Sequence, residues 1–305
     1  MLAVLLAASA ATALAPALIG EREPRAVRMG GAGLDRLVQR LLSTLPGPGS
    51  GGYDRARRAE AAALRRAYTA ARAGDAARSQ RLAAPLGYVV RPLGEGSMAA
   101  LALAEPPEAD GAPGHGWGLF VHAARAPTDL AVEVVHPRAD AFTALMGLLA
   151  FRATGARDLL IAGAHRAADA DGSADVAHAS SSAFQAAHLA VLHPGVTVVQ
   201  LHGFDARGRS PGYGDAVVSD GTPEPSAPAR ALARTLRATG LRVCLYRGER
   251  CSPLAGTTNV QGRATRAAGG AFIHLELALR LRREPGMRAR VIRALVGALG
   301  AASRK

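Results

Sequence analysis

The sequence predicts a three-layer α/β/α protein with a mixed, centrally parallel sheet, preceded by a small helical N-terminal segment. From about residue 82 onward, short apolar runs end at Gly, Pro or polar residues, as strands do. Helical stretches separate the later runs, which favours parallel crossovers, whereas short loops between the first three or four favour antiparallel pairing. The length of 305 residues accommodates one such domain and a smaller appendage.

The first 20 residues carry no charged side chain, and Ala15 and Ala17 are small enough for a cleavage site. This segment predicts an export signal, with an uncleaved membrane anchor or an ordinary apolar helix as alternatives. An anchor there is the one membrane contact that we expect. Apolar residues at helical spacing then predict helices over 33–43 and 54–81. The expected division is a signal or anchor over 1–20, a helical segment over 21–81 and an α/β domain over 82–305.

The remaining elements follow from the spacing of apolar residues. Strands are predicted over 86–91, 98–104, 117–122, 130–135, 158–163, 196–202, 241–246 and 271–277. Helices are predicted over 139–154, 179–192, 226–239 and 287–302. Residues 256–263 are interpreted as a polar loop, because Gly, Thr, Asn and Gln dominate them.

The chain is basic, with a formal net charge of +13, and Lys305 is its one lysine. The arginines are spread along the sequence, and aromatic residues make up 4%, too few for a base-stacking surface. We therefore expect no nucleic-acid partner. A positive surface attracts anionic partners instead, such as an anionic peptide, a polyglutamate-like polymer or cell-wall material.

The chain has two cysteines, Cys244 and Cys251, seven positions apart with a Gly-containing turn between them. Such a pair predicts a small disulfide loop in an oxidising compartment, and two unpaired thiols are the alternative. Together with the apolar start of the chain, this predicts a periplasmic or secreted protein.

Ligands bind at the carboxyl ends of the strands in open α/β sheets, so residues that follow apolar runs are the first candidates. His136 ends one run, with Asp140 in the next turn, and His202 ends another. Glu276 lies inside an apolar run near the C-terminus, where burying a carboxylate is costly without a partner. These four residues are the predicted site.

Two imidazoles and one carboxylate are common protein ligands of a hydrolytic zinc ion, with a further carboxylate as proton shuttle. His136, Asp140 and His202 are therefore predicted to bind Zn²⁺, with Glu276 as general base. Glu133 is the competing third ligand. Asp140 is preferred because alternation along an extended strand points Glu133 away from the face of His136.

This order resembles the zinc carboxypeptidase-like hydrolases and related zinc-dependent amidohydrolases, over about residues 115–285. That family places a His-x-x-Glu pair after one strand, a lone His after a later strand and a catalytic Glu on a strand near the C-terminus. Here the pair is His136-Pro-Arg-Ala-Asp140, which is one residue longer and one methylene shorter. The resemblance implies hydrolysis of an amide or peptide bond.

The resemblance also implies that arginine and asparagine side chains hold a substrate carboxylate, for which the planar guanidinium is suited. The substrate-binding candidates are Arg138, Arg166, His178, Asn259 and Arg263. The prediction is an exported zinc hydrolase of carboxypeptidase, amidase or deacylase type. Its alternative is an inactive exported binding protein of the same fold, and a metal-independent pair of His178 with Ser182 is a third option.

Overall fold

The computed structural model describes residues 32–94, 99–106, 114–205 and 213–300. The predicted signal over 1–20 lies outside these residues. Within the described ranges, every helix falls short of the length and apolar character needed to cross a membrane.

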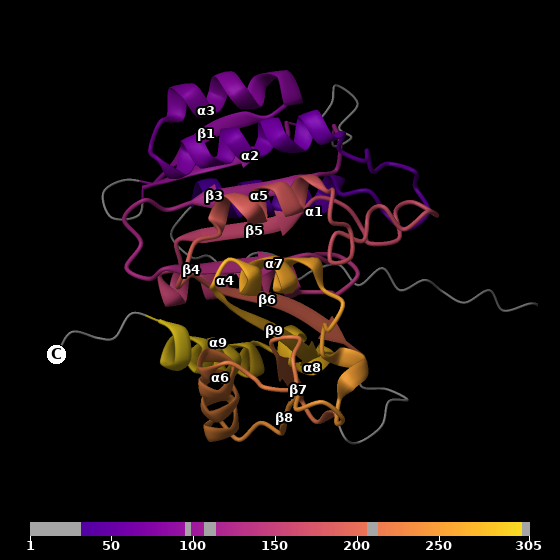
Figure 1. Ribbon diagram of the computed structural model, residues 1–305, viewed down its shortest axis with the longest axis vertical. Coiled ribbons are helices and arrows are strands. Elements are labelled where there is room, and N and C mark those ends of the chain that lie inside the picture. Colours follow the sequence, from indigo (N-terminus) through magenta and orange to yellow (C-terminus); the bar gives the residue numbers. More distant parts are fainter. Residues whose placement is uncertain (1–31, 95–98, 107–113, 206–212, 301–305) are drawn as a thin grey trace, which may run out of the picture.

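One sheet runs through the whole described chain, and Figure 1 shows its strands stacked from β1 at one end of the molecule to β8 at the other. The strand order is β1-β2-β3-β5-β4-β6-β9-β7-β8. The strands are β1 (Val89–Leu93), β2 (Ala100–Ala104), β3 (Gly118–His122), β4 (Leu130–Val134), β5 (Asp158–Ala162), β6 (Thr197–Phe204), β7 (Ala216–Ser219), β8 (Val243–Leu245) and β9 (Ala271–Ala278).

The strand directions follow the prediction. β1, β2, β3 and β5 pair antiparallel in succession, whereas β5, β4, β6 and β9 form a parallel centre. β7 pairs antiparallel with β9 and parallel with β8. The predicted mixed, centrally parallel sheet is therefore confirmed.

Helices cover both faces of the sheet, which gives the three predicted layers (Figure 1). They are α1 (Ala32–Thr44), α2 (Arg58–Arg72), α3 (Ala76–Ala83), α4 (Thr143–Thr154), α5 (Ala183–Val191), α6 (Ala227–Ala238), α7 (Val260–Ala267), α8 (Leu279–Arg283) and α9 (Pro285–Leu299). One core joins α1, α4, α6 and α9 to one face, and a second joins α2, α3 and α5 to the other. α1 to α3 pack into the same two cores as the sheet. The predicted division of the chain near residue 81 into a helical segment and an α/β domain stays a prediction.

The alternation of side chains decides which face carries polar groups. Along β6, Val199 and Leu201 pack into the core beneath α4, α6 and α9, so Gln200 and His202 face the α5 and α7 layer. Along β9, Ile273, Leu275 and Leu277 do the same. His274 and Glu276 therefore lie on the same face of the sheet as His202.

Three local expectations differ from the structure. The predicted stretch 54–81 is two helices, because Gly74 adopts a left-handed φ of 79° between α2 and α3. The loop interpretation of 256–263 is wrong in its second half. There Asn259 caps α7 by accepting a hydrogen bond from the Gly262 N–H. β7 was not predicted, since its four residues are too short for a clear pattern.

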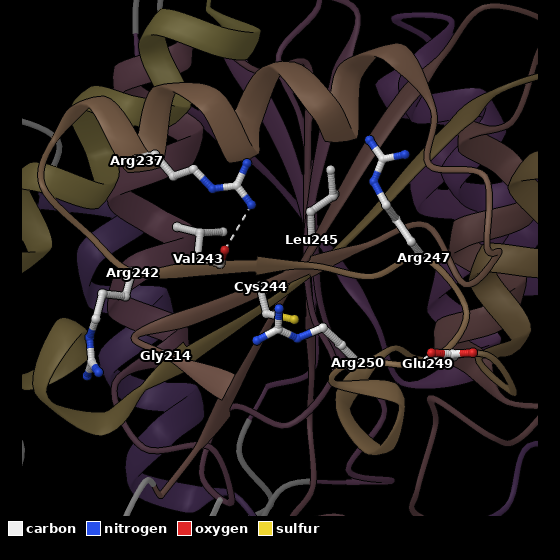
Figure 2. Close-up of a pocket in the computed structure, with 9 residues that line it drawn as sticks. All are labelled: Gly214, Arg237, Arg242, Val243, Cys244, Leu245, Arg247, Glu249 and Arg250. Atoms are coloured by element: carbon white, nitrogen blue, oxygen red, sulfur yellow. Dashed lines mark hydrogen bonds between the residues drawn. The ribbon is translucent and has the colours of Figure 1, made fainter. Parts of the chain in front are cut away.

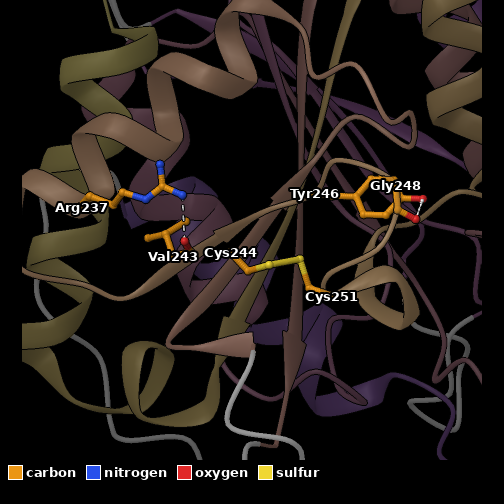
Figure 3. Close-up of a disulfide and its surroundings, with 6 residues drawn as sticks. All are labelled: Arg237, Val243, Cys244, Tyr246, Gly248 and Cys251. Atoms are coloured by element: carbon orange, nitrogen blue, oxygen red, sulfur yellow. Dashed lines mark hydrogen bonds between the residues drawn. A yellow bond between two sulfur atoms is a disulfide. The ribbon is translucent and has the colours of Figure 1, made fainter.

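The predicted disulfide is present, and it joins Cys244 on β8 to Cys251 after the following turn (Figure 3). Tyr246 lies between them and donates a hydrogen bond from its hydroxyl to the Gly248 carbonyl over 3.3 Å. The bond closes a small loop at the edge of the sheet, which limits the conformations of that loop.

Candidate metal and hydrolase site

The predicted ligands meet at the carboxyl ends of the parallel strands. His136 follows β4, and His202 lies near the end of β6. Glu276 on β9 is the direct register partner of His202 across the β6–β9 pair. All three side chains are buried, with 2%, 4% and 8% exposure respectively. The sheet therefore brings together groups that are far apart in the sequence.

Asp140 is the centre of the cluster. Its Oδ2 atom lies 3.3 Å from His136 Nδ1 and 3.6 Å from His202 Nδ1. The Gly203 backbone N–H donates to the same oxygen over 3.1 Å. One atom from each of His136, Asp140 and His202 falls within 4.8 Å of the other two.

The distal nitrogens of both imidazoles have partners. His136 Nε2 lies 2.9 Å from Asp175 Oδ1, and His202 Nε2 lies 2.7 Å from Gln200 Oε1. An amide oxygen accepts hydrogen bonds, so His202 donates from Nε2 and turns its Nδ1 toward Asp140. Carboxylate or carbonyl partners of this kind orient histidines that bind metals.

The charges of the cluster follow from burial and pairing. Burial alone would lower the pKa of His136, but the bonds to Asp140 and Asp175 outweigh burial and raise this pKa above its ordinary value. Despite burial, the bond to His136 holds the pKa of Asp140 well below its usual range. Burial lowers the pKa of His202, which favours the neutral ring.

These donors fit a small divalent cation. In neutral His202 the Nδ1 lone pair faces an oxygen of Asp140, an arrangement that is unfavourable without positive charge between them. Ligand atoms around a tetrahedral zinc ion with bonds of about 2.0–2.1 Å lie about 3.4 Å apart. The separations of 3.3 and 3.6 Å around Asp140 match that value. Nitrogen and carboxylate donors are also the set that zinc accepts.

His274 extends the cluster and was not among the predicted site residues. Its ring stacks on His202 with centroids 4.1 Å apart, and its buried Nδ1 has no hydrogen-bond partner among the described residues. Burial lowers its pKa well below the ordinary value. His202, His274 and Glu276 form a second group with ligand atoms within 4.8 Å. The signal that could have found His274 is its spacing of two from Glu276 on one strand.

Glu133 lies apart from these ligands, though not for the expected reason. β4 ends at Val134, so alternation does not extend to His136. Glu133 faces the same layer as Gln200, its register partner, and accepts a hydrogen bond from that amide over 2.9 Å. Its other oxygen lies 2.6 Å from His188 Nδ1. Glu133 thus supports Gln200, which in turn holds His202.

Arg282 ties the three site-bearing segments together. Its buried guanidinium donates to the carbonyls of Ala141, Phe204 and Leu277. These carbonyls follow Asp140, His202 and Glu276 by one, two and one positions. A Cβ atom at Gly203 would lie 2.1 Å from the guanidinium carbon, so a larger residue there would displace Arg282 from these bonds. Nothing in the sequence pattern marked Arg282.

Two predicted substrate residues follow the central strands: Arg138 lies in the loop after β4, and Arg166 lies in the loop after β5. Arg166 forms an ion pair with Asp175, the partner of His136, and keeps a side-chain exposure of 42%. With His136 and Arg166 as the main charged partners, the pKa of Asp175 falls to about 2 although burial opposes this. Arg138 is exposed and donates to the Leu45 carbonyl over 3.2 Å.

The other predicted substrate residues surround the start of α7. His178 is exposed, and its Nδ1 lies 3.5 Å from Thr258 Oγ1. Arg263 is exposed and donates to the Thr258 carbonyl. Asn259 is buried, and both ends of its amide are bonded, because Nδ2 donates to Gln200 over 2.6 Å.

Ser182, the nucleophile of the metal-independent option, is the N-cap of α5. Its Oγ accepts a hydrogen bond from the Gln185 N–H and donates to the Ala179 carbonyl. The Ser182 hydroxyl is therefore committed to the helix end.

No family model matches the chain, and no curated protein matches it in sequence. Among solved structures, a bacteriophage poly-gamma-glutamate hydrolase aligns with 56% of this chain and 83% of its own, with 13% identity and a TM-score of 0.40. An N-formylglutamate amidohydrolase from Ralstonia eutropha covers 55% and 92%, with 14% identity and a TM-score of 0.40. A zinc-free form of YndL covers 69% and 90%, with 13% identity and a TM-score of 0.37. These are distant similarities.

Proposed function

We propose that this chain is an exported zinc-dependent hydrolase that cleaves an amide or peptide bond in an anionic substrate. The observation that carries the proposal is the pair of imidazole Nδ1 atoms directed at one oxygen of Asp140, 3.3 and 3.6 Å away. Glu276 stands on the neighbouring strand in register with His202. The bond class is the one that the sequence resemblance implies.

His136, Asp140 and His202 would hold the ion, and Asp175 and Gln200 orient the two rings. When bound, zinc would act as a Lewis acid that polarises a carbonyl and lowers the pKa of water.

The Glu276 carboxylate accepts a proton from the attacking water and passes it to the departing nitrogen. Arg166 is bonded to Asp175 but retains further N–H donors for a substrate carboxylate. The net charge of +13 favours the approach of an anionic substrate.

The test compares two variants of the full chain against a panel of N-acylated amino acids and acidic peptides. Glu276→Gln should keep about one zinc ion per chain and lose about 10²- to 10⁴-fold in turnover. His202→Ala should lose both zinc and turnover. The full chain is expressed with its N-terminal segment, and N-terminal sequencing of the recovered protein shows whether that segment is cleaved and where.

Equal turnover in Glu276→Gln and the unmodified chain would contradict the role of this residue. Zinc binding without any Glu276-dependent turnover would favour the binding-protein alternative. A chain that takes up no zinc from a zinc buffer would rule out the proposed mechanism.

A further inference from the structure

A second charged feature lies at the far edge of the sheet, around β8. It is a pocket with a volume of about 550 Å³, and Figure 2 shows arginine side chains spread along both sides of the strand. Its charged lining consists of Arg237, Arg242, Arg247, Arg250 and Glu249. Four cations and one anion in one concave surface make the pocket strongly positive.

Two of these arginines are engaged with the protein. Arg237 donates to the Val243 carbonyl over 2.9 Å, and Arg242 pairs with Asp215 over 3.2 Å. Among the described residues, Arg247 and Arg250 have no hydrogen-bond or ion-pair partner, and both are exposed. Two unpaired guanidinium groups in one pocket repel each other, and a bound anion relieves that repulsion.

The position of β8 favours an extended chain as the ligand. β8 is the last strand in the sheet order, so its outer side has no strand partner among the described residues. An extended peptide can add to such an edge through main-chain hydrogen bonds, while side chains on it contact neighbouring pockets. Arginine forks bind carboxylates with two parallel hydrogen bonds.

A nucleic acid fits this pocket less well. No aromatic side chain lines it. Tyr246, next to Leu245 and Arg247, is 6% exposed, and Tyr213, next to Gly214, is partly buried against the small core at the disulfide. Single-stranded nucleic acids need such rings for stacking.

The disulfide fixes the geometry of the pocket. Cys244 lies within β8, and Cys251 follows Arg250 directly, so the bond anchors the turn that carries Arg247 and Arg250 against the strand (Figure 3). The turn therefore presents its arginines without a large loss of entropy on binding.

We propose that this arginine pocket binds an acidic peptide chain, as a site separate from the metal site. Cys244 pairs with Val217, which pairs with Glu276, so the two sites are two strands apart, about 10 Å at the usual strand spacing. One extended chain of several residues can reach both. Delivery of the bound chain to the metal site for cleavage rests on the proposed function, whereas binding of the peptide at the arginine pocket does not.

The test measures fluorescence anisotropy of a labelled deca-L-glutamate peptide at low salt with the full chain carrying His202→Ala. This background removes the metal site, so the result does not depend on catalysis. Arg247→Gln/Arg250→Gln should weaken binding about tenfold or more. The matched control is Arg290→Gln/Arg293→Gln on α9, which removes the same charge from exposed positions outside the pocket and should change binding less than twofold.

The proposal is overturned if the peptide does not bind, or if both double variants weaken binding equally. It is also overturned if a labelled deca-glutamine peptide or a single-stranded DNA decamer binds as tightly as deca-glutamate. Circular dichroism of each variant confirms that the fold is intact.

Discussion

Two buried clusters of histidine and aspartate lie at opposite ends of the central strands. They differ in the hydrogen-bond partners of the aspartate. At the amino ends of the parallel strands, away from the metal site, Asp158 Oδ1 lies 2.9 Å from His122 Nδ1 and accepts hydrogen bonds from Tyr68 and Arg72. A hydroxyl and a guanidinium, both donors, therefore stabilise its negative charge. Around Asp140, in contrast, two imidazole nitrogens face one carboxylate oxygen.

The direction of each strand explains the difference in position. His122 also ends a strand, but β3 runs antiparallel to β5, so its carboxyl end meets Asp158 at the start of β5. His202 ends a parallel strand and lies at the edge where ligands bind. A histidine at the end of a strand thus indicates a site only when the strand belongs to the parallel centre.

The largest difference in stability and zinc content is expected between Asp158→Ala and Asp140→Ala. Asp158→Ala removes the buried anion that pairs with part-buried Arg72 and contacts buried His122, so the free energy of unfolding should fall by about 3–5 kcal/mol. Its zinc content should stay unchanged. Asp140→Ala should remove zinc binding. Urea unfolding in the presence of a chelator measures the stability, and elemental analysis measures the zinc content. Loss of zinc in Asp158→Ala would show that the Asp158 cluster also supports the metal site.

Zinc should stabilise one cluster only. With free zinc at about 100 times its Kd, linkage adds about 2.7 kcal/mol to the free energy of unfolding. The unmodified chain and Tyr68→Phe should both show this gain, and His202→Ala should not. Thermal unfolding with and without zinc measures it, and a gain in His202→Ala would place the ion elsewhere.

Asp175 should have a smaller effect, because it acts through His136. Asp175→Asn keeps a side chain of the same size but weakens the bond to His136 Nε2, so zinc affinity should fall about 10- to 100-fold. Asp169→Asn in the same loop is the control and should leave the affinity unchanged. Competition with a zinc-binding dye gives both values, and equal affinities would show that Asp175 does not orient His136.

The smallest expected effect comes from Tyr68→Phe at the other cluster. The variant removes a buried hydroxyl that lies 2.8 Å from both Asp158 Oδ1 and the Val121 carbonyl. The free energy of unfolding should fall by about 1–2 kcal/mol. A larger loss accompanied by loss of zinc would mean that the two clusters are coupled through the sheet.

The sequence was sufficient for the layers and for most strands, because buried strands are apolar runs and their lengths are typical. It also placed His136, His202 and Glu276 at strand ends or within a strand. Their convergence depended on the strand order, in which β9 inserts between β6 and β7, and no local pattern encodes that.

Residues that act through other residues were the hardest to predict. Gln200 supports His202, two positions along the same strand, and Arg282 supports the site through hydrogen bonds to backbone carbonyls of other segments. The role of Arg282 has no composition or spacing signal. His274 did have one, since it alternates in phase with Glu276, and the strand pattern could have shown it.

Zinc content per chain tests the central claim most directly. Elemental analysis of the full chain, His202→Ala and His122→Ala compares the two clusters under one condition. We expect about one zinc ion per chain in the unmodified protein and in His122→Ala, and none in His202→Ala. Zinc that persists in His202→Ala, or disappears in His122→Ala alone, would contradict the assignment of the metal site to the carboxyl ends of the parallel strands.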